Sequence, residues 1–527
     1  ISAFILLPVL SVIFLALFPA DNIWPHLIST TLPRYISTTV LLMISVGVLA
    51  GIVGTFTAWF VVRYSFTGSS WLQWALLMPL AIPGYVGAYA LVDLLEYAGP
   101  VQSTLRGVFG WSSSQDYWFP EIRSFGAAVF VLSLALYPYV YLLTRVAFRD
   151  QTSSVEEVAR SLGASSYKRL FKINFPLARP AIAAGVAIVM METVNDFGTV
   201  DYFAVQTLTT GIFSVWLQSS NVGGAAQLAC VVLAMVILLV SLEKLSRRKM
   251  QFFNMSSKHN KVTKIKLKGF SNLLAFSCCF VPFLLGFALP LIVLAEHSMS
   301  NPKLFLDRAL IDATWNTVFT GTIAAAFTVL LSIFMVFGMK SIKGRLPKII
   351  MPITTIGYAV PGAVLGVGIL IPLAALDNGV ADVIYYITQI DIGLIFTGTS
   401  FAIILAYIVR FFAIGQGATE AALGRISPNL EHAARSLGTS RTSILNRIHL
   451  PIIKGSLGSA MLLVFVDCVK ELPATLLLRP FNFNTLSTRV HEQASLEDLV
   501  NAAPAAIYIS LVGLCAVVLL AKANKLD

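Results

Sequence analysis

Four acidic residues stand inside long apolar stretches of this sequence, where their carboxylates could bind a cation. They form two pairs with the same spacing, Glu192 with Asp196 and Asp467 with Glu471. Residues four apart share one face of a helix, so each pair would present both carboxylates on one side. A charged group inside a membrane is costly and by default marks a functional position. Carboxylates suit a hard cation, whereas a path for anions would display Lys or Arg.

The same acids also fit a role in helix packing or gating, and the sequence leaves both roles open. Lys470 lies next to Glu471 and could neutralise it in a structural ion pair. His491 and Glu492 could form a metal pair, but no second ligand set stands at a defined spacing. A solvated loop is therefore the preferred interpretation of that dipeptide, and no metal site is predicted with certainty.

A second motif occurs twice, in segments that align without gaps at an offset of 275 residues. The copies read VEEVARSLGASSYKRLFKINFP (155–176) and LEHAARSLGTSRTSILNRIHLP (430–451). Each predicts a helix, a break at Gly163 or Gly438, and a second helix that ends near Pro176 or Pro451. Such a helix can fit a groove on a partner protein, although an ordinary amphipathic helix at the membrane interface has the same pattern.

The elements that carry these residues are expected to be membrane-spanning helices. The chain has 527 residues, 57% hydrophobic and 12% charged, which is too little polar surface for a soluble globule of this size. About a dozen apolar stretches are long enough to cross a bilayer. They are 2–19, 38–62, 72–95, 124–146, 178–197, 225–243, 270–295, 312–337, 349–372, 393–413, 454–472 and 503–522. Pro79, Pro83 and Gly84 in the third could permit a kink that widens during gating, or could shape a static helix.

The net charge of +11 does not indicate nucleic-acid binding, because the basic residues cluster in loops between apolar stretches. Nine Lys or Arg lie between Glu243 and Lys268, which places that segment in the cytoplasm by the positive-inside rule. Both termini are then cytoplasmic. The predicted outer loops 198–224 and 373–392 contain no Lys or Arg, which agrees with this orientation.

The duplication predicts an all-α polytopic membrane protein whose twelve or so transmembrane helices form two pseudo-symmetric six-helix halves. Pro83-Gly84 in the third stretch matches Pro361-Gly362 in the ninth, so the repeat extends beyond the loops. The predicted division is a first permease half at 1–245, a basic cytoplasmic linker at 246–269 and a second half at 270–527. A pathway between the halves would suit this arrangement.

The repeated segment resembles the EAA loop of permeases in binding-protein-dependent ABC importers. The pattern E-x-A-x-x-x-G, then nine residues, then I-x-[LF]-P is filled in the first copy by Glu157, Ala159, Gly163, Ile173 and Pro176. The second copy fills it with Ala434, Gly438, Ile448, Leu450 and Pro451, and has His432 where the Glu is expected. Glu431, which aligns with Glu156, could substitute for it.

In that family each loop docks on an ATPase subunit and transmits its closure to the spans. The resemblance therefore implies two copies of a separate ATPase subunit on the cytoplasmic side, with ATP and Mg bound there and no cofactor in this chain. The sequence contains no G-x-x-x-x-G-K-[ST] loop for nucleotide phosphates. The chain is thus expected to be a transport subunit without catalytic residues, not an enzyme.

Two further stretches resemble the ferric-iron type of fused permease within this class. They are METVNDFGTVDYF (191–203) and KELPATLLLRPFNFNTLSTRV (470–490). The resemblance implies a bacterial inner-membrane protein to which a periplasmic binding protein delivers ferric ion. The loop 479–501 is then the expected docking surface. Its candidate contacts are Arg489, Glu492, Glu497 and Asp498.

Other functions remain open from the sequence. Permeases for thiamine, sulfate or polyamine share the repeated loop and the two-half layout. A secondary transporter can also have two parallel repeats, but it would work on an ion gradient without an ATPase. An intramembrane enzyme is a third class, and no nucleophile-base pair or metal-ligand motif in the sequence supports it.

Overall fold

The computed structural model of this protein describes residues 1–149, 151, 161–163, 165–248, 264–340, 342, 344–390 and 393–523. Within this part, helices form almost all of the regular structure, as predicted. The two described strands, β1 (Tyr64–Ser65) and β2 (Ile265–Lys266), pair in parallel with Tyr64 opposite Ile265. The fold is therefore an all-α fold with one very short strand pair.

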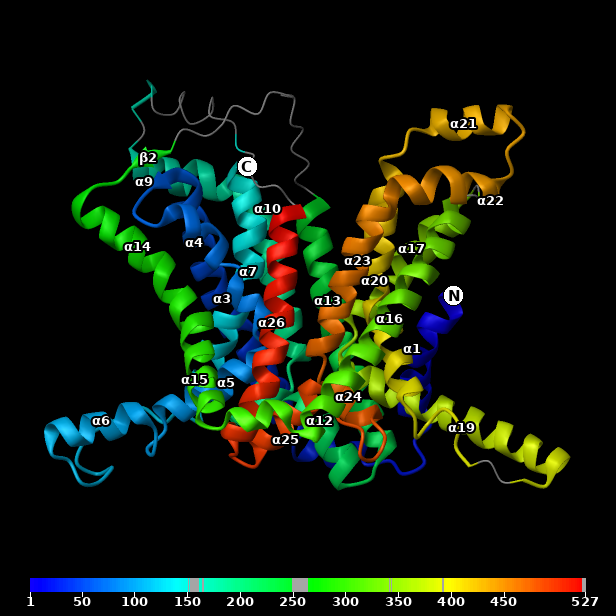
Figure 1. The fold of residues 1–527 in the computed structure, drawn as a ribbon, viewed down its shortest axis with the longest axis horizontal. Helices are drawn as coiled ribbons and strands as arrows, with labels where there is room; N and C mark the ends of the chain where they lie inside the picture. Colours follow the sequence, from blue (N-terminus) through cyan, green and yellow to red (C-terminus); the bar gives the residue numbers. More distant parts are fainter. Residues whose placement is uncertain are drawn as a thin grey trace. The chain divides into compact units, whose positions relative to one another are not determined.

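The helices belong to two compact units, each of which is described by itself. Unit 1 is built from residues 1–24, 212–233 and 305–489, and unit 2 from residues 25–211, 234–304 and 490–527, as far as these are described. Figure 1 shows long helices lying side by side in both. Each unit therefore combines segments from both of the predicted halves.

The elements of unit 1 are α1 (Ser2–Leu17), η3 (Ser214–Gln218), α16 (Arg308–Lys340), α17 (Leu346–Thr354), α18 (Ile356–Ala359), α19 (Gly362–Thr388), α20 (Ser400–Gly424), α21 (Pro428–Ser436), α22 (Arg441–Ile444), η6 (Leu445–His449), α23 (Leu450–Lys470) and α24 (Pro473–Leu478). Those of unit 2, besides the strands, are α3 (Leu32–Arg63), α4 (Ser69–Ala75), η1 (Met78–Ala81), α5 (Gly84–Leu95), α6 (Pro100–Phe109), α7 (Phe125–Arg149), α9 (Ser166–Arg169), η2 (Leu170–Asn174), α10 (Phe175–Asn195), α11 (Gly198–Tyr202), α14 (Gly269–Phe283), η4 (Leu284–Ala288), α15 (Leu289–Ser300) and α26 (Leu499–Ala523). The elements α2 (Trp24–Ser29), α12 (Leu208–Phe213), α13 (Val222–Arg248), η5 (Pro302–Leu306) and α25 (Leu486–Ser495) have residues in both units.

Small residues let the long helices pack closely within each unit. In unit 2, a Cβ on Gly54 or Gly185 would collide with the backbone at Val140 or beside it, so α3 and α10 both approach α7 at glycines. In unit 1, Gly415 of α20 lies against Thr328 and Ser332 of α16. Close approach at small residues is the usual way in which membrane helices pack without a hydrophobic driving force.

Terminal helices from one predicted half complete the unit formed mainly by the other. In unit 1, α1 packs against α19, where Gly368 lies against the carbonyl of Pro8. In unit 2, α26 packs against η1 and α15, and Gly513 lies against the backbone of Ala81. The predicted boundaries at 245 and 269 divide the chain by duplication and stay a prediction. Residues 249–263 of the predicted linker lie outside the described part.

The predicted spans correspond to long apolar helices, with three differences. The ninth stretch, 349–372, is divided among α17, α18 and the start of α19, and α19 continues to Thr388 within the predicted outer loop 373–392. Ten described helices are long and apolar enough to cross a membrane, or eleven if one bent pair is counted as a span. The first stretch forms only the 16-residue α1, which at ~1.5 Å per residue is shorter than the ~30 Å bilayer core. The third stretch is the bent pair, Ser69–Ala81 with Gly84–Phe109, at 95°.

The break in the third stretch follows from its proline. The ring of Pro83 forces the preceding Ile82 out of helical geometry, to φ −102° and ψ 123°, and Pro83 then precedes the first turn of α5. Val360 and Pro361 repeat this geometry before α19, with ψ 124° and 144°. The chain therefore leaves helical geometry at both Pro-Gly pairs and divides each stretch into separate helices, and a gating role for the break stays a prediction.

Candidate functional site

The two acid pairs lie on α10 and α23, and the second acid of each pair marks the end of the helix. Asp196 directly follows α10 and Glu471 directly follows α23, with extended ψ angles of 132° and 123°. A short helix comes next, α11 in one copy and α24 in the other. Each long helix therefore turns at its second acid.

Asp196 closes the N-terminal end of α11. Its carboxylate accepts hydrogen bonds from Thr199 N at 3.0 Å, Thr199 Oγ1 at 2.9 Å and Val200 N at 3.1 Å. The first N–H groups of a helix have no partner inside the helix. A negative charge there is also stabilised by the positive end of the helix dipole. Asp196 is thus a capping residue of the turn.

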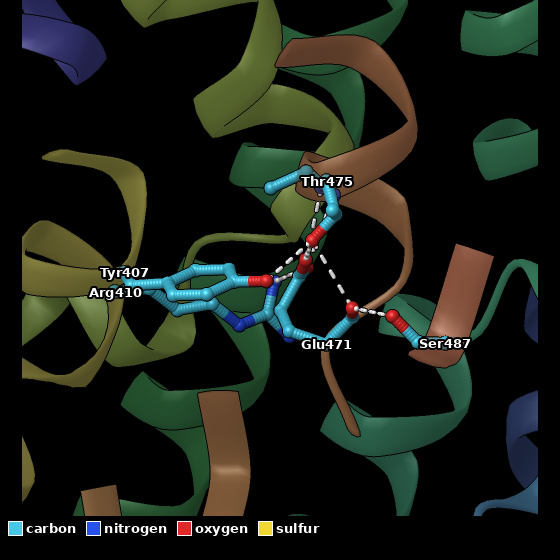
Figure 2. A network of polar contacts seen from close by, with 6 residues as sticks. Tyr407, Arg410, Glu471, Thr475 and Ser487 are labelled. Atoms are coloured by element: carbon cyan, nitrogen blue, oxygen red, sulfur yellow. Dashed lines mark hydrogen bonds and ion pairs between the residues drawn. The ribbon is translucent and has the colours of Figure 1, made fainter. Parts of the chain in front are cut away.

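Glu471 makes the equivalent contacts in the second copy (Figure 2). Its carboxylate accepts hydrogen bonds from Ala474 N and Thr475 N, both at 3.0 Å, and from Thr475 Oγ1 at 2.8 Å. Arg410 of α20 adds an ion pair, with Nη1 3.6 Å from Oε1 of Glu471. Tyr407, also of α20, lies 2.7 Å from the same threonine hydroxyl. The turn after α23 is therefore tied to α20.

The two caps differ by one methylene group. Asp196 reaches a threonine three residues ahead, whereas the longer Glu471 reaches one four residues ahead. The broken third stretch packs against both caps: a Cβ on Gly84 would stand 3.1 Å from Thr199 Oγ1, and one on Gly362 would collide with Glu471 and Arg410. The duplication thus preserves a contact between a Pro-Gly break and a capped turn.

Glu192 and Asp467, the first acids of the pairs, are half-buried one helical turn before the caps. Lys470 and Arg410 supply positive charge near Asp467. Within the described part of the chain, no three His, Cys, Asp or Glu side chains are grouped so that they could hold a metal ion. That the four predicted acids line a substrate path stays a prediction, since the structure gives the second acids structural contacts.

The predicted loop of the second copy has the expected helix-Gly-helix form. After α21, Gly438 adopts φ +75°, and Thr439 N and Gly438 N donate to the carbonyls of Ala434 and Arg435. This is the Schellman arrangement, in which glycine occupies the left-handed position. Ala434 is buried, whereas Leu437 is 85% exposed. The backbone of Glu431 and His432 lies in α21, and their side chains are outside the described part.

The first copy matches wherever it is described. Gly163 adopts φ +77°, and the preceding Leu162 is 81% exposed, as is its counterpart Leu437. Glu156, Glu157 and Ala159 lie outside the described residues. The loops therefore share a left-handed glycine next to an exposed leucine. The exposure of the leucine is the feature that the motif alone did not reveal.

The prediction that a second helix ends near Pro176 was wrong, and the same holds for Pro451. Helical structure continues from α9 through η2 into α10, and from α22 through η6 into α23. The segments η2 and η6 are π-helical, and both prolines lie in the first turn of the helix that follows. Phe175 N and Leu450 N each donate to the carbonyl five residues back, Leu170 or Leu445, so a wider π turn precedes each proline. Ile173 and Ile448 both lie within the π-helical segments and are half-buried.

Arg63 at the end of α3 was not identified from the sequence. It is 5% exposed, and its Nη2 donates to Asn174 Oδ1 at 3.0 Å and to Gln151 Oε1 at 3.3 Å. Gln151 in turn donates to the carbonyl of Asn174 at 2.9 Å. Because Asn174 lies in η2, this network fixes the base of the first loop to α3.

The predicted docking residues are partly engaged in contacts of their own. Arg489 pairs with Asp307 at 2.6 Å, and Glu497 pairs with Arg123 at 2.7 Å. Asp498 accepts hydrogen bonds from the backbone and side-chain nitrogens of Asn501. Glu492 lies in α25 with a half-buried side chain. Their role in docking stays a prediction.

Comparisons with known proteins give a consistent picture. The family described as "Binding-protein-dependent transport system inner membrane component" matches the chain twice, over residues 43–252 and 335–525. The Fe(3+)-transport system permease protein FbpB 2 of Haemophilus influenzae is 27% identical over 493 residues, which cover 92% of this chain and 89% of the relative. The ferric transport system permease protein FbpB of Actinobacillus pleuropneumoniae is 24% identical, with coverage of 84% and 64%. The molybdenum transport system permease protein ModB of Escherichia coli is 28% identical but covers only 37% of this chain and 86% of its own.

Proposed function

This chain belongs to the family of inner membrane components of binding-protein-dependent transport systems, and from that premise we propose that it is the permease of an ATP-driven importer of ferric iron. The observation that carries the proposal is the duplicated loop, in which Leu162 and Leu437 stand exposed beside left-handed glycines. Exposed apolar side chains on a short helix suit a groove on a partner protein. The multi-pass helical fold supports the same conclusion.

Two copies of a separate ATPase subunit are the proposed partners of the loops. They would bind ATP and Mg, because the sequence of this chain contains no phosphate-binding loop. Glu156, Glu157 and Glu431 are the candidate polar contacts, with His432 in the remaining position. This chain therefore carries out no covalent chemistry and converts movement of the ATPases into opening of the path.

The connection from the loops to the capped turns supports this mechanical role. The helical run Thr442–Lys470 joins the second loop to Glu471, and at ~1.5 Å per residue its 29 residues span ~44 Å. The run Leu170–Asn195 does the same for Asp196. A displacement of either loop is thus transmitted along one continuous helix to the turn at the other end.

The proposed orientation places the loops and both termini in the cytoplasm of a bacterial cell. The basic segment between Glu243 and Lys268 is the support for it. The capped turns and the loop 479–501 then face the periplasm, where a binding protein would deliver the substrate. Nucleic acid is not among the proposed partners.

Ferric ion is proposed as the substrate because relatives with ferric transport names match most of this chain. The acids Glu192 and Asp467 agree with a cation. The relative with a molybdenum transport name matches a much smaller share of the chain. Thiamine, sulfate and polyamine remain outcomes that the test below must exclude.

Reconstitution is the decisive experiment. The chain would be placed in liposomes with its ATPase and with candidate binding proteins, each loaded with one substrate. We expect ATP-dependent ferric uptake and stimulated ATP hydrolysis only with the ferric-binding protein. Uptake by the chain alone on an ion gradient would contradict the importer. Stimulation by a protein loaded with sulfate, thiamine or polyamine would contradict the substrate.

A further inference from the structure

Three polar side chains meet in unit 2, on α5, α11 and α25. The hydroxyl of Tyr89 lies 3.0 Å from Nδ1 of His491, and Nε2 of His491 lies 3.9 Å from Oδ2 of Asp201. Tyr89 is 1% exposed, while the side chains of His491 and Asp201 are 12% and 45% exposed. The trio therefore runs from a buried phenol to a carboxylate that solvent reaches.

The neighbours of the trio hold its imidazole and its carboxylate in place. The ring of Phe197 lies 5.6 Å from the imidazole, and the ring of Tyr202 lies 4.4 Å from that of Tyr89. Asp201 stands on α11, the short helix that Asp196 caps. The cap that ends α10 therefore also positions the solvent-facing member of the trio.

The shared architecture does not require these polar groups. Tyr89 and Asp201 belong to the first copy and His491 to the second. At the aligned positions stand Val367, Leu476 and, in the first copy, Phe213. The duplication thus has apolar residues at one of these sets of three positions and polar residues at the other. A buried polar group is costly unless it is hydrogen-bonded, so the bond between Tyr89 and His491 offsets a cost that the apolar set does not have.

The donor atoms fit an open metal site. If Nδ1–H of the imidazole donates to the hydroxyl of Tyr89, Nε2 keeps its lone pair. Metal-bound histidines usually donate their other N–H in this way, most often to a carboxylate, a carbonyl or water. Two ligands that each lie ~2.1 Å from one ion stand ~3.0 Å apart at adjacent positions and ~4.2 Å apart at opposite ones, and the observed 3.9 Å is nearer the second arrangement. Imidazole and carboxylate are both ligands for iron.

A site with two protein ligands suits a passing ion better than a resident one. The remaining coordination positions stay open to water or to groups that arrive with the ion. Transport requires that binding be favourable enough for entry and weak enough for release.

We propose that His491 and Asp201 form a transient subsite for a hard trivalent cation, with Tyr89 as the residue that positions the imidazole. The assignment of ferric ion to this subsite rests on the proposed function. The site combines residues of both copies, and the aligned set Val367, Leu476 and Phe213 has no ligand atoms in its side chains.

The test uses the purified full chain and terbium(III) as the probe, because this hard trivalent ion is excited by nearby tyrosine rings such as Tyr202. We expect saturable luminescence that gallium(III) displaces. His491→Phe and Asp201→Leu, which introduce the residues found at the aligned positions, should each weaken terbium binding at least about tenfold, and Tyr89→Phe severalfold. Decay rates in light and heavy water should show one additional bound water in His491→Phe. In Tyr89→Phe, a shifted terbium decay rate with an unchanged Tm would show that Tyr89 positions the imidazole. A lowered Tm would instead indicate a structural effect.

His297→Phe is the matched control. His297 also faces an aspartate, Asp93, but at 2.7 Å the two are joined by a direct hydrogen bond. Its removal should leave terbium affinity unchanged. Equal affinity in wild type, His491→Phe and Asp201→Leu would overturn the subsite, and so would an equal loss in His297→Phe.

Ferric uptake in the reconstituted importer separates the two proposals. If uptake is ferric but terbium binding does not depend on the trio, the subsite fails and the proposed function stands. If another substrate is transported and terbium binding still depends on the trio, the ferric assignment fails and the cation site stands.

Discussion

Arg410 Nη1 lies 3.6 Å from Glu471 Oε1, and the residue that aligns with this arginine in the other copy is the uncharged Ala135. The two paired side chains are only 11% and 2% exposed. The turn after α23 is therefore held by an ion pair and a cap, whereas the turn after α10 has the cap of Asp196 without that arginine. This asymmetry makes the two turns unequal in their sensitivity to mutation.

Removing Glu471 should destabilise the protein more than removing Asp196. Glu471→Ala leaves the charge of Arg410 buried, at a cost of about 3–5 kcal/mol, whereas Asp196→Ala loses a helix cap worth about 1 kcal/mol. Thermal unfolding in detergent should give a clearly lower Tm for Glu471→Ala. The double variant Arg410→Met/Glu471→Gln should recover much of the loss. Equal Tm values for the two alanine variants would contradict this account.

Gly362→Ala should disturb the capped turn directly. The new Cβ would collide with the Glu471 carboxylate and the Arg410 guanidinium, so both must move. Gly84→Ala places its Cβ 3.1 Å from a threonine hydroxyl and should be milder. Gly379→Ala, in the same helix as Gly362 but with no heavy atom within 4 Å of the new Cβ, is the control and should keep the wild-type Tm. We expect the Tm order Gly379→Ala, Gly84→Ala, Gly362→Ala from highest to lowest.

The exposed leucines of the two loops should bind the ATPase without contributing to folding. Leu162→Ser and Leu437→Ser are each expected to weaken ATPase binding about tenfold or more, because burying a leucine contributes about 1.5–3 kcal/mol. The Tm of the chain should not change. Leu496→Ser, at a leucine that is 73% exposed outside the loops, is the control. Wild-type affinity in both loop variants, measured by titration of the ATPase, would argue against docking at these positions.

Gly163→Pro and Gly438→Pro should uncouple ATP use from transport while membrane insertion stays intact. These glycines have φ angles of +77° and +75°, and proline fixes φ near −65°, so the loop must refold around the substitution. ATP hydrolysis and uptake would be measured in the same liposomes. Normal uptake in both variants would refute the coupling role.

Arg63→Met should weaken transport through the base of the first loop. Loss of its bonds to Asn174 and Gln151 frees η2 from α3, while the methionine retains most of the packing. The ratio of substrate transported to ATP hydrolysed should fall, with little change in ATPase binding. Arg106→Met, which removes an arginine bonded to a carbonyl near α6, should leave that ratio unchanged. A fall in ATPase affinity alone would place Arg63 in docking instead.

Much of the fold was predictable because it depends on local patterns. Apolar stretches of span length, the Pro-Gly breaks and the left-handed glycines all follow from residue type and spacing. The capping role of the second acids could also have been predicted. Asp196 and Glu471 each stand just beyond a helix end. A threonine three residues after Asp196 and another four residues after Glu471 can donate to these carboxylates, which is a capping pattern.

Other features depend on contacts that no local pattern contains. Tyr89 and His491 are 402 positions apart, and only the packing of α5 and α25 brings them together. Each unit is likewise assembled from segments of both halves. The sequence does not predict which helices pair, because the possible partners are equally apolar. We did not predict that the helix continues through Pro176. Proline normally interrupts a helix, and the π-helical segment before it, with Phe175 N bonded to the carbonyl of Leu170, accommodates it here.

The packing of α1 against α19 has a consequence for synthesis of the protein. The first helix leaves the ribosome about 345 residues before its partner begins, which at about 5–20 residues per second is a delay of about 20–70 s. Throughout that interval the face of α1 that contains Pro8 must be covered by lipid or by the insertion machinery. Among the described segments of unit 1, α1 therefore waits longest for its packing partner.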